Sequence, residues 1–373
     1  MFVAAAIISL SSAQEIATRL TRLTDENVDV RRSAAEELGQ QGSAAGGAVP
    51  ALIACLKDTD VRVRANAAWA LGKIQQPAAQ IVPALIGALA DADWTVRHNS
   101  ALSLTWVGAP AADALAKALA DARPFVRLFA ADTMRRIDPA RTPTVTPVLV
   151  TLLDESNEEV RVSAAQVIGM IGAPATGAVP GLLRLLDHKN QLARVAAIEA
   201  LGAIGPGAGA AVPMLVRLLP ADQGAEVRIA AAQALARIGE APDTWIPGVI
   251  GMFQPTRQEK IPAGAELALA RVGAPAVPHL IKALQDADGG VREFACETLG
   301  LLGNTAAVAV PGLVDRLQDS RWEVRQKAAC ALGDIGVARD PVLRGLKALT
   351  ADANEIVRVN AQGALDKLSK ASP

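Results

Sequence analysis

Apolar residues recur along the chain with the period of an α-helix, and the whole pattern returns about every 33 residues. Counted from a repeated arginine, the apolar side chains stand at positions −1, +3, +4, +7 and +10, which form one stripe of a helix. A repeat of this length predicts an array of one small helical unit. The arginines that index the pattern are Arg31, Arg64, Arg97, Arg127, Arg161, Arg194, Arg228, Arg292, Arg325 and Arg358.

Each stripe belongs to a segment close to V-R-x-x-A-A-x-x-L-G, as at residues 63–72 and 324–333. Its paired alanines, such as Ala67 and Ala68, place the smallest side chains at the centre of the stripe. Small residues at that point let a neighbouring helix approach closely. The segments are therefore predicted to be stacked amphipathic helices.

A stop signal and a start signal separate successive stripes. Glycine stands 11 residues after the index position, which is Pro262 in one unit and arginine in the others, at Gly42, Gly108, Gly172, Gly205, Gly239, Gly273, Gly303 and Gly336. Glycine ends many helices in a left-handed conformation. A proline-led apolar run then predicts a new helix start, at Pro50, Pro83, Pro180, Pro213, Pro278 and Pro311. The repeated unit is thus predicted to be a helical hairpin.

Eleven such units fill nearly all of the 373 residues, which leaves no room for a separate catalytic domain. We expect one continuous array over residues 14–370. One unit, residues 240–273, is irregular because Pro262 stands where the arginine is expected. Its Trp245, Met252, Phe253 and Pro255 also depart from the pattern, and the loss of one arginine could make a hinge there.

These motifs resemble the HEAT repeat family, and within it the short bacterial HEAT-like repeats of the phycobilisome-lyase type. The resemblance rests on the proline-led first helix, the aspartate in the turn, the Val-Arg opening of the second helix and the Ala-Ala and Leu-Gly pairs that follow. It implies an all-α fold, a right-handed α-solenoid superhelix of about eleven hairpins. Ankyrin and tetratricopeptide repeats share the period, but the Thr-Pro-Leu-His signature and tyrosine are both absent from the sequence.

Aspartates precede most of the arginines by six residues. A carboxylate in the turn can accept backbone N–H groups at a helix start, and it can pair with an arginine of its own unit or of the next one. HEAT families have such ladders between units, so we predict a structural role for these residues and no ligand binding. The predicted ladder includes Asp58, Arg64, Asp91, Arg97, Asp121, Arg127, Asp319 and Arg325.

Composition and charge narrow the classes of partner. A hydrophobic content of 51% suffices for a continuous core, and a net charge of −1 lacks the basic excess typical of nucleic-acid binders. We found no apolar run approaching the 18 or more residues of a membrane span, so none is predicted. We expect a monomer whose partner is another protein of unknown identity.

Residues 1–13 allow two interpretations. They resemble the apolar core of a secretory signal with a cleavage site at Ser11-Ser12-Ala13, although no Lys or Arg precedes the run. Alternatively, they form an apolar cap on the first unit. We favour export, which would place the protein in the periplasm, over a cytoplasmic location.

Motifs for catalysis or metal binding are lacking in the sequence. The three histidines, His98, His188 and His279, are far apart, and none is followed by the Glu that marks the metal-binding HEAT enzymes. The three cysteines are too few for a disulfide framework. We therefore predict no catalytic residue, no metal and no cofactor.

Binding residues are sought on the face of the second helix opposite the stripe, at positions +1, +2, +5 and +9, which would line the concave groove. An aromatic cluster emerges there beside Asn66 and Lys73. Trp and Arg are enriched in interface hot spots, so the cluster is a candidate partner-binding patch. Alternatively, its rings fill irregular packing beside the loop after Gly108. The candidate residues are Trp69, His98, Asn99, Trp106, Phe129 and Arg136.

Three functions follow from these observations. The first is a non-enzymatic scaffold or adaptor that holds a protein partner in the groove. The second, implied by the family resemblance, is a phycobiliprotein chromophore lyase-like subunit or chaperone. The third is a HEAT-like DNA glycosylase, for which Trp69, Trp106, Arg136 and Asp132 fit loosely, but the near-neutral charge argues against it.

Overall fold

The computed structural model describes residues 14–220, 224–253 and 264–371, and it divides into two compact units, residues 1–178 and 179–373. The candidate signal at residues 1–13 and the irregular Pro255 and Pro262 lie outside the described residues. All regular structure in the described ranges is helical, without a strand.

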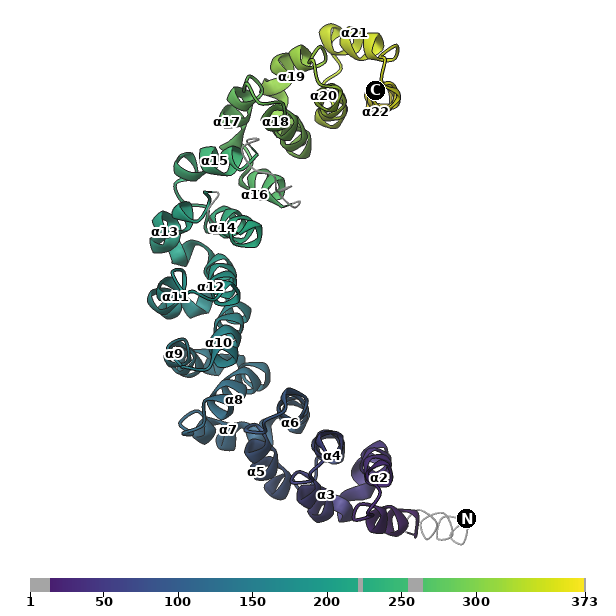
Figure 1. Ribbon diagram of the computed structural model, residues 1–373, viewed down its shortest axis with the longest axis vertical. Coiled ribbons are helices and arrows are strands. Elements are labelled where there is room, and N and C mark those ends of the chain that lie inside the picture. The colour runs from purple at the N-terminus through teal and green to yellow at the C-terminus, as the bar shows by residue number, and fades with distance from the viewer. Residues whose placement is uncertain (1–13, 221–223, 254–263, 372–373) are drawn as a thin grey trace. The chain divides into compact units, whose positions relative to one another are not determined.

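In residues 14–178, first and second helices alternate along the chain (Figure 1). Residues 14–22 form the opening first helix. The later first helices are α3 (Val49–Cys55), α5 (Ala78–Ala88), α7 (Ala112–Ala118) and α9 (Thr142–Leu152). The second helices are α2 (Val28–Gln40), α4 (Val61–Ile74), α6 (Trp94–Val107), α8 (Pro124–Ile137) and α10 (Glu158–Ile171). Short 3₁₀ segments connect them at η1 (Gly42–Ala48), η2 (Ala109–Ala111), η3 (Pro139–Arg141) and η4 (Ala173–Ala178).

Residues 179–371 repeat this alternation. The first helices are α11 (Val179–Leu185), α13 (Val212–Arg217), α15 (Pro242–Gly251), α17 (Ala276–Ala283), α19 (Val310–Arg316) and α21 (Asp340–Leu349). The second helices are α12 (Gln191–Ile204), α14 (Ala225–Ile238), α16 (Ala265–Val272), α18 (Gly289–Leu301), α20 (Trp322–Ile335) and α22 (Glu355–Ala371), and the 3₁₀ segments are η5 (Gly205–Ala211) and η6 (Gly303–Ala309).

The described residues therefore contain eleven hairpins, five in the first unit and six in the second. In each unit, Figure 1 shows the first helices in one layer and the second helices in another. This confirms the predicted all-α hairpin array. The single continuous array over residues 14–370 stays a prediction.

Helix ends follow the predicted signals closely. All eight predicted stop glycines have positive φ, for example Gly108 at 72° and Gly336 at 79°. At the end of α4 this position is held by Gln75, which has φ 62°. The proline prediction was wrong at Pro83, because α5 begins at Ala78 and the proline lies inside the helix.

The apolar stripe of each second helix forms the core. In α4, for instance, Val63, Ala67, Ala68 and Leu71 are fully buried. Glycine then allows the next second helix to approach, since a Cβ placed on Gly72 would lie 2.6 Å from the Cα of Ser103 in α6. Stacking of the second helices thus depends on small residues at fixed positions.

One stretch contradicts the expectation that no segment has the character of a membrane span. Residues Gln191–Arg217 have the required length, and an 18-residue window within them has a mean hydropathy of 1.5. The stretch comprises α12, η5 and α13, it is interrupted at Ala208 by a non-helical conformation, and 56% of its apolar window is buried. Core helices of a soluble repeat have these properties too, because apolar stripes and Gly-Ala loops follow one another without charges.

The irregular unit retains its core. Trp245 of α15 is fully buried and its indole N–H donates to the carbonyl of Glu240 at 3.2 Å. The second helix α16 begins only at Ala265. A hinge in this unit stays a prediction.

Candidate protein-binding surface

Arginine–aspartate rungs connect successive hairpins. The guanidinium of Arg64 donates through Nε and Nη2 to both carboxylate oxygens of Asp91, at 2.8 and 3.0 Å, and through Nη1 to the carbonyl of Asp58 at 2.9 Å. One arginine side chain thus hydrogen-bonds to the turn of its own hairpin and forms an ion pair with the next hairpin. The same forked geometry joins Arg31 to Asp58, Arg292 to Asp319 and Arg325 to Asp352.

The rung aspartates are held in their charged form. Burial of the Asp319 carboxyl disfavours its ionisation, but the hydrogen bonds from Arg292 and from the N–H of Arg321 outweigh that effect and lower its pKa. The same balance lowers the pKa values of Asp58 and Asp91. The rungs are therefore ion pairs at neutral pH.

The helix starts are capped by a different residue from the one predicted. Asp58 accepts the N–H of Asp60 at 2.8 Å, and Asp60 is the residue that caps α4 by accepting from Arg62 and Val63. In this turn the rung aspartate Asp58 shapes the backbone, while Asp60 caps the helix.

Arg97, one of the predicted ladder residues, pairs with a glutamate instead of a turn aspartate. Arg97 is only 1% exposed, its guanidinium lies 4.0 Å from the ring centroid of Phe125, and it pairs with Glu159 of α10. The other rungs join an arginine to the aspartate 27 residues later, which for Arg97 is the position of Pro124. The step shortened to 30 residues moves the aspartate out of this register, so Arg97 reaches α10 instead.

Asp121 and Arg127, also predicted as ladder residues, have other partners. Asp121 forms a forked pair with Arg123, both contacts at 2.9 Å, and this lowers the pKa of Asp121 to about 2. Arg127 donates to the carbonyl of Asp121 at 2.8 Å and pairs with Glu155 of the following turn. Arg127 therefore still connects hairpins, through a glutamate.

The inner face, defined as the exposed side of the second helices, brings part of the aromatic cluster together. Lys73 of α4 places its ammonium 4.1 Å from the ring centroid of Trp106 in α6 and 5.6 Å from that of Trp69. Both indoles are half-buried. Trp69 also lies over Gly39 of α2, where a Cβ would come within 2.4 Å of its ring. The rings therefore pack against their neighbours and remain partly open to solvent.

His98 and Asn99 do not join this group. His98 stacks on Trp94, one turn earlier in α6, with ring centroids 4.7 Å apart. Asn99 donates its side-chain amide to the carbonyl of Ala65 at 3.0 Å, and Asn66 donates likewise to Arg32 at 3.2 Å. The asparagines thus join adjacent second helices. His98 and Trp106 stand eight residues apart in α6, which is about 12 Å along a helix.

The predicted residues of α8 lie on the same inner face. Positions +2, +5 and +9 of successive second helices form rows across this face, here called the inner rows. Phe129 is half-buried and Arg136 is exposed. The carboxylate of Asp132, which is buried, is 2.7 Å from the guanidinium of Arg136 and 2.6 Å from that of Arg135. Asp132 is therefore neutralised by two arginines, so it offers no free catalytic base.

The sequence also matches a family model described as HEAT repeats, over residues 16–82, 82–169, 146–236, 257–320 and 277–366. The chain belongs to the HEAT repeat family. No curated protein matches the sequence.

Solved structures show the same fold at low sequence identity. Kap121p bound to Nup53p aligns with 97% of this chain and 45% of its own, with 15% identity and a TM-score of 0.71. Kap121p bound to Pho4p aligns with 96% of this chain and 45% of its own, with 16% identity and a TM-score of 0.70. Importin beta aligns with 95% and 57%, with 12% identity and a TM-score of 0.53. The chain thus spans about half the length of these proteins.

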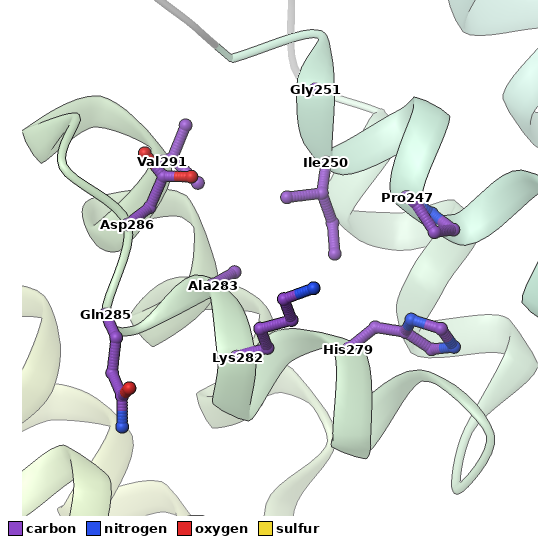
Figure 2. A pocket seen from close by; sticks show the side chains of 9 residues that line it. All are labelled: Pro247, Ile250, Gly251, His279, Lys282, Ala283, Gln285, Asp286 and Val291. Carbon is purple, nitrogen blue, oxygen red and sulfur yellow. The ribbon is translucent and has the colours of Figure 1, made fainter.

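Hollows on the first-helix side recur with the HEAT repeat. Figure 2 shows one of about 420 Å³, where Pro247 and Ile250 of α15 face His279 and Lys282 of α17. His279 is itself held by Asp243, 2.8 Å away. Hollows of about 610 and 500 Å³ lie between α3 and α5 and between α19 and α21.

Each hollow is lined by the aliphatic residue three positions after a proline of a first helix, namely Ile53, Ile250 or Val314. This shared register shows that the hollows arise from the spacing of the hairpins. Across the described part of the chain, no three His, Cys, Asp or Glu side chains gather in a way that could hold a metal ion.

Sequence reasoning missed three residues of this region. Trp94 is 56% exposed, Met170 is 62% exposed, and Arg135 Nη2 lies 3.0 Å from the sulfur of Met170. Met170 stands nine residues after Arg161, in the row of Lys73 and Trp106. Extending that row to α10 would have found it.

Proposed function

We propose that this HEAT repeat protein is a non-enzymatic scaffold that binds a protein partner on the inner face of α4, α6 and α8. The carrying observation is the Lys73 ammonium over the half-buried Trp106 and Trp69 rings. Partly open tryptophans beside cations are the residue types that dominate interface energetics.

The fold gives this proposal a second line of support. Kap121p, which has a similar fold, has been solved bound to Pho4p and bound to Nup53p. A hairpin array presents long exposed rows of side chains on helices that the rungs hold in place. Such a surface suits recognition of another protein better than it suits a closed reaction centre.

Affinity capture from the source cell tests the proposal. The wild-type protein is compared with a variant carrying Lys73→Ala and Trp106→Ala. A matched control carries Leu301→Ala and Lys327→Ala, which alter the inner rows of α18 and α20. Circular dichroism must show equal helix content in all three.

We expect a specific protein to be retained by the wild type and by the control, and to be lost from the Lys73 and Trp106 variant. Identical sets of captured proteins from all three would overturn the proposal. A mobility shift with duplex DNA at moderate salt tests the glycosylase-like alternative, and retention of a phycobiliprotein tests the lyase-like one.

A further inference from the structure

The inner rows of helices α4, α6, α8 and α10 carry an excess of positive charge, whereas the equivalent row of α2 holds Glu36 and Glu37. The last turns of α4, α6, α8 and α10, residues 66–74, 99–107, 129–137 and 163–171, contain three cations and one carboxylate, a net charge of +2. The carboxylate, Asp132, is shared by Arg135 and Arg136. Lys73 forms no ion pair within the described residues, since its contacts there are with indole rings.

Helix dipoles alone do not account for this arrangement. A cation near the C-terminus of a helix is favourable, which explains the presence of Lys73 and Arg136 in their last turns. It does not explain why two indoles and the exposed thioether of Met170 occupy the same rows. Apolar side chains at solvent-facing positions lower solubility unless a partner covers them.

In the second unit, the lysines in the same rows of α18, α20 and α22 form ion pairs with acidic side chains. In α18, α20 and α22, residues 294–302, 327–335 and 360–368 contain two lysines and three acids, a net charge of −1. Lys327 pairs with Glu297 at 2.6 Å and Lys367 pairs with Asp334 at 2.7 Å. The HEAT repeat therefore does not itself require unpaired cations at these positions.

We propose that the surface formed by Trp69, Lys73, Trp106, Arg135, Arg136 and Met170, here called the cation–aromatic surface, binds an acidic protein segment. Carboxylates of the segment pair with Lys73 and Arg136, and an apolar side chain lies on the open parts of the indoles and on Met170. This inference rests on the proposed function and adds the charge of the partner, through electrostatic complementarity.

Selection from a random peptide library displayed on phage tests the charge directly. Wild-type protein is immobilised, and the enriched peptides are synthesised and measured by fluorescence anisotropy at low and high salt. The test variant carries Lys73→Gln and Arg136→Gln, which remove charge but keep side-chain length. The matched control carries Lys327→Gln and Lys367→Gln, whose lysines are paired across α18, α20 and α22.

We expect acidic peptides with an apolar residue to be enriched. Their affinity should fall roughly tenfold in the Lys73 and Arg136 variant, stay unchanged in the control and weaken with salt. The inference would be overturned if the selected peptides were basic or neutral, or if no peptide were enriched. Equal affinity of the peptides for the test variant and the wild type would also overturn it. If the capture experiment succeeds while this one fails, the scaffold function stands and only the acidic partner is rejected.

Single-stranded and duplex DNA oligonucleotides serve as a second polyanion in the same assay. Weak DNA binding, with the enriched peptides bound more tightly, supports a protein segment as the occupant. DNA that binds more tightly than every selected peptide, and loses affinity in the Lys73 and Arg136 variant, would assign the surface to nucleic acid and overturn the inference.

Discussion

Helices α4 and α6 of the first unit and α18 and α20 of the second use the same rung but present different inner rows. Arg64 and Arg292 each fork onto the carboxylate 27 residues later, with contacts of 2.7 to 3.0 Å. The inner rows, in contrast, carry Trp69, Lys73 and Trp106 in the first unit and paired acids and lysines in the second.

This comparison separates two kinds of position within one repeat. The arginine, the turn aspartate and the Leu-Gly glycine determine how hairpins stack, so they recur with little change. Positions +5 and +9 lie on the inner face and differ from hairpin to hairpin, although Trp69 at +5 packs over Gly39 and Asp132 at +5 is buried. Substitutions should therefore divide into those that destabilise the array and those that alter only binding.

The largest loss of stability is expected where the first unit departs from the shared rung. Arg97→Ala removes a buried guanidinium that stacks on Phe125 and pairs with Glu159. We expect about 3 kcal/mol of destabilisation, from lost packing and from loss of the Arg97 hydrogen bonds to the carbonyls of Asp91 and Ala92. Urea unfolding measures it.

Arg358→Ala is the control, since Arg358 in the described residues donates only to the carbonyls of Asp352 and Ala353. Its expected cost is about 1 kcal/mol. Equal losses of unfolding free energy for the two variants would show that Arg97 stabilises the protein no more than Arg358, the last arginine of the array.

Asp319→Asn should destabilise the second unit by about 2 kcal/mol, because it leaves the guanidinium of Arg292 without its counter-charge in a site where the aspartate side chain is 2% exposed. Asp58→Asn, whose side chain is 12% exposed, should cost about 1 kcal/mol. Thermal unfolding of both variants measures the difference, and a reversed order would contradict the role of burial.

Lowering the pH should also reveal how much the arginine–aspartate rungs stabilise the protein. The folded-state pKa values of Asp58 and Asp319 lie below the unfolded value of about 3.9. The stability from each rung is therefore complete above about pH 4 and is lost as the pH falls through the folded pKa. The melting temperature of the Asp58→Asn, Asp319→Asn double variant should fall less than that of the wild type between about pH 4 and pH 2.

Close approach of second helices predicts a further effect. Gly72→Ala would place a Cβ 2.6 Å from the Cα of Ser103, and overpacking of this kind costs about 1–3 kcal/mol, partly offset by the better helix propensity of alanine. We expect a net loss of about 1 kcal/mol. At Gly363, where a Cβ meets open space, the same change should stabilise the protein slightly; stabilisation at both positions would disprove the tight contact.

The smallest effect is expected for Lys73→Gln, about 0.5 kcal/mol, the value of an exposed cation–π contact. Lys327→Gln should cost a similar amount, because surface ion pairs are weak. Calorimetry of both variants checks this. A loss above about 2 kcal/mol for Lys73→Gln would make the residue structural and would remove it from the binding surface.

The hairpin array was predictable because its signals are local and repeated. Gly108, Gly205 and Gly336 each stop a helix by a backbone conformation that needs no knowledge of the tertiary structure. The ladder role of Arg325 was predictable from the repeat, whereas its partner Asp352 became known only from the structure.

The remaining features depend on register and orientation, which spacing alone does not give. Arg97 lacks a turn aspartate at the usual distance because the step that follows it is shortened to 30 residues, and the sequence did not indicate that Glu159 pairs with it instead. His98 and Asn99 share α6 with Trp106, but one stacks on Trp94 and the other bonds to Ala65. Only the contacts reveal that the predicted patch divides along the helix.

The bond between Arg97 and Glu159 has a consequence for how the first unit comes apart. Hairpin arrays are usually described by the intrinsic stability of each hairpin and by its coupling to the nearest neighbours alone. Arg97 belongs to α6 and Glu159 to α10, so this contact bypasses the hairpin that contains α8. The hairpin of α8 then opens at the additional cost of a second-neighbour coupling, and hydrogen exchange should show α6, α8 and α10 opening as one cooperative unit.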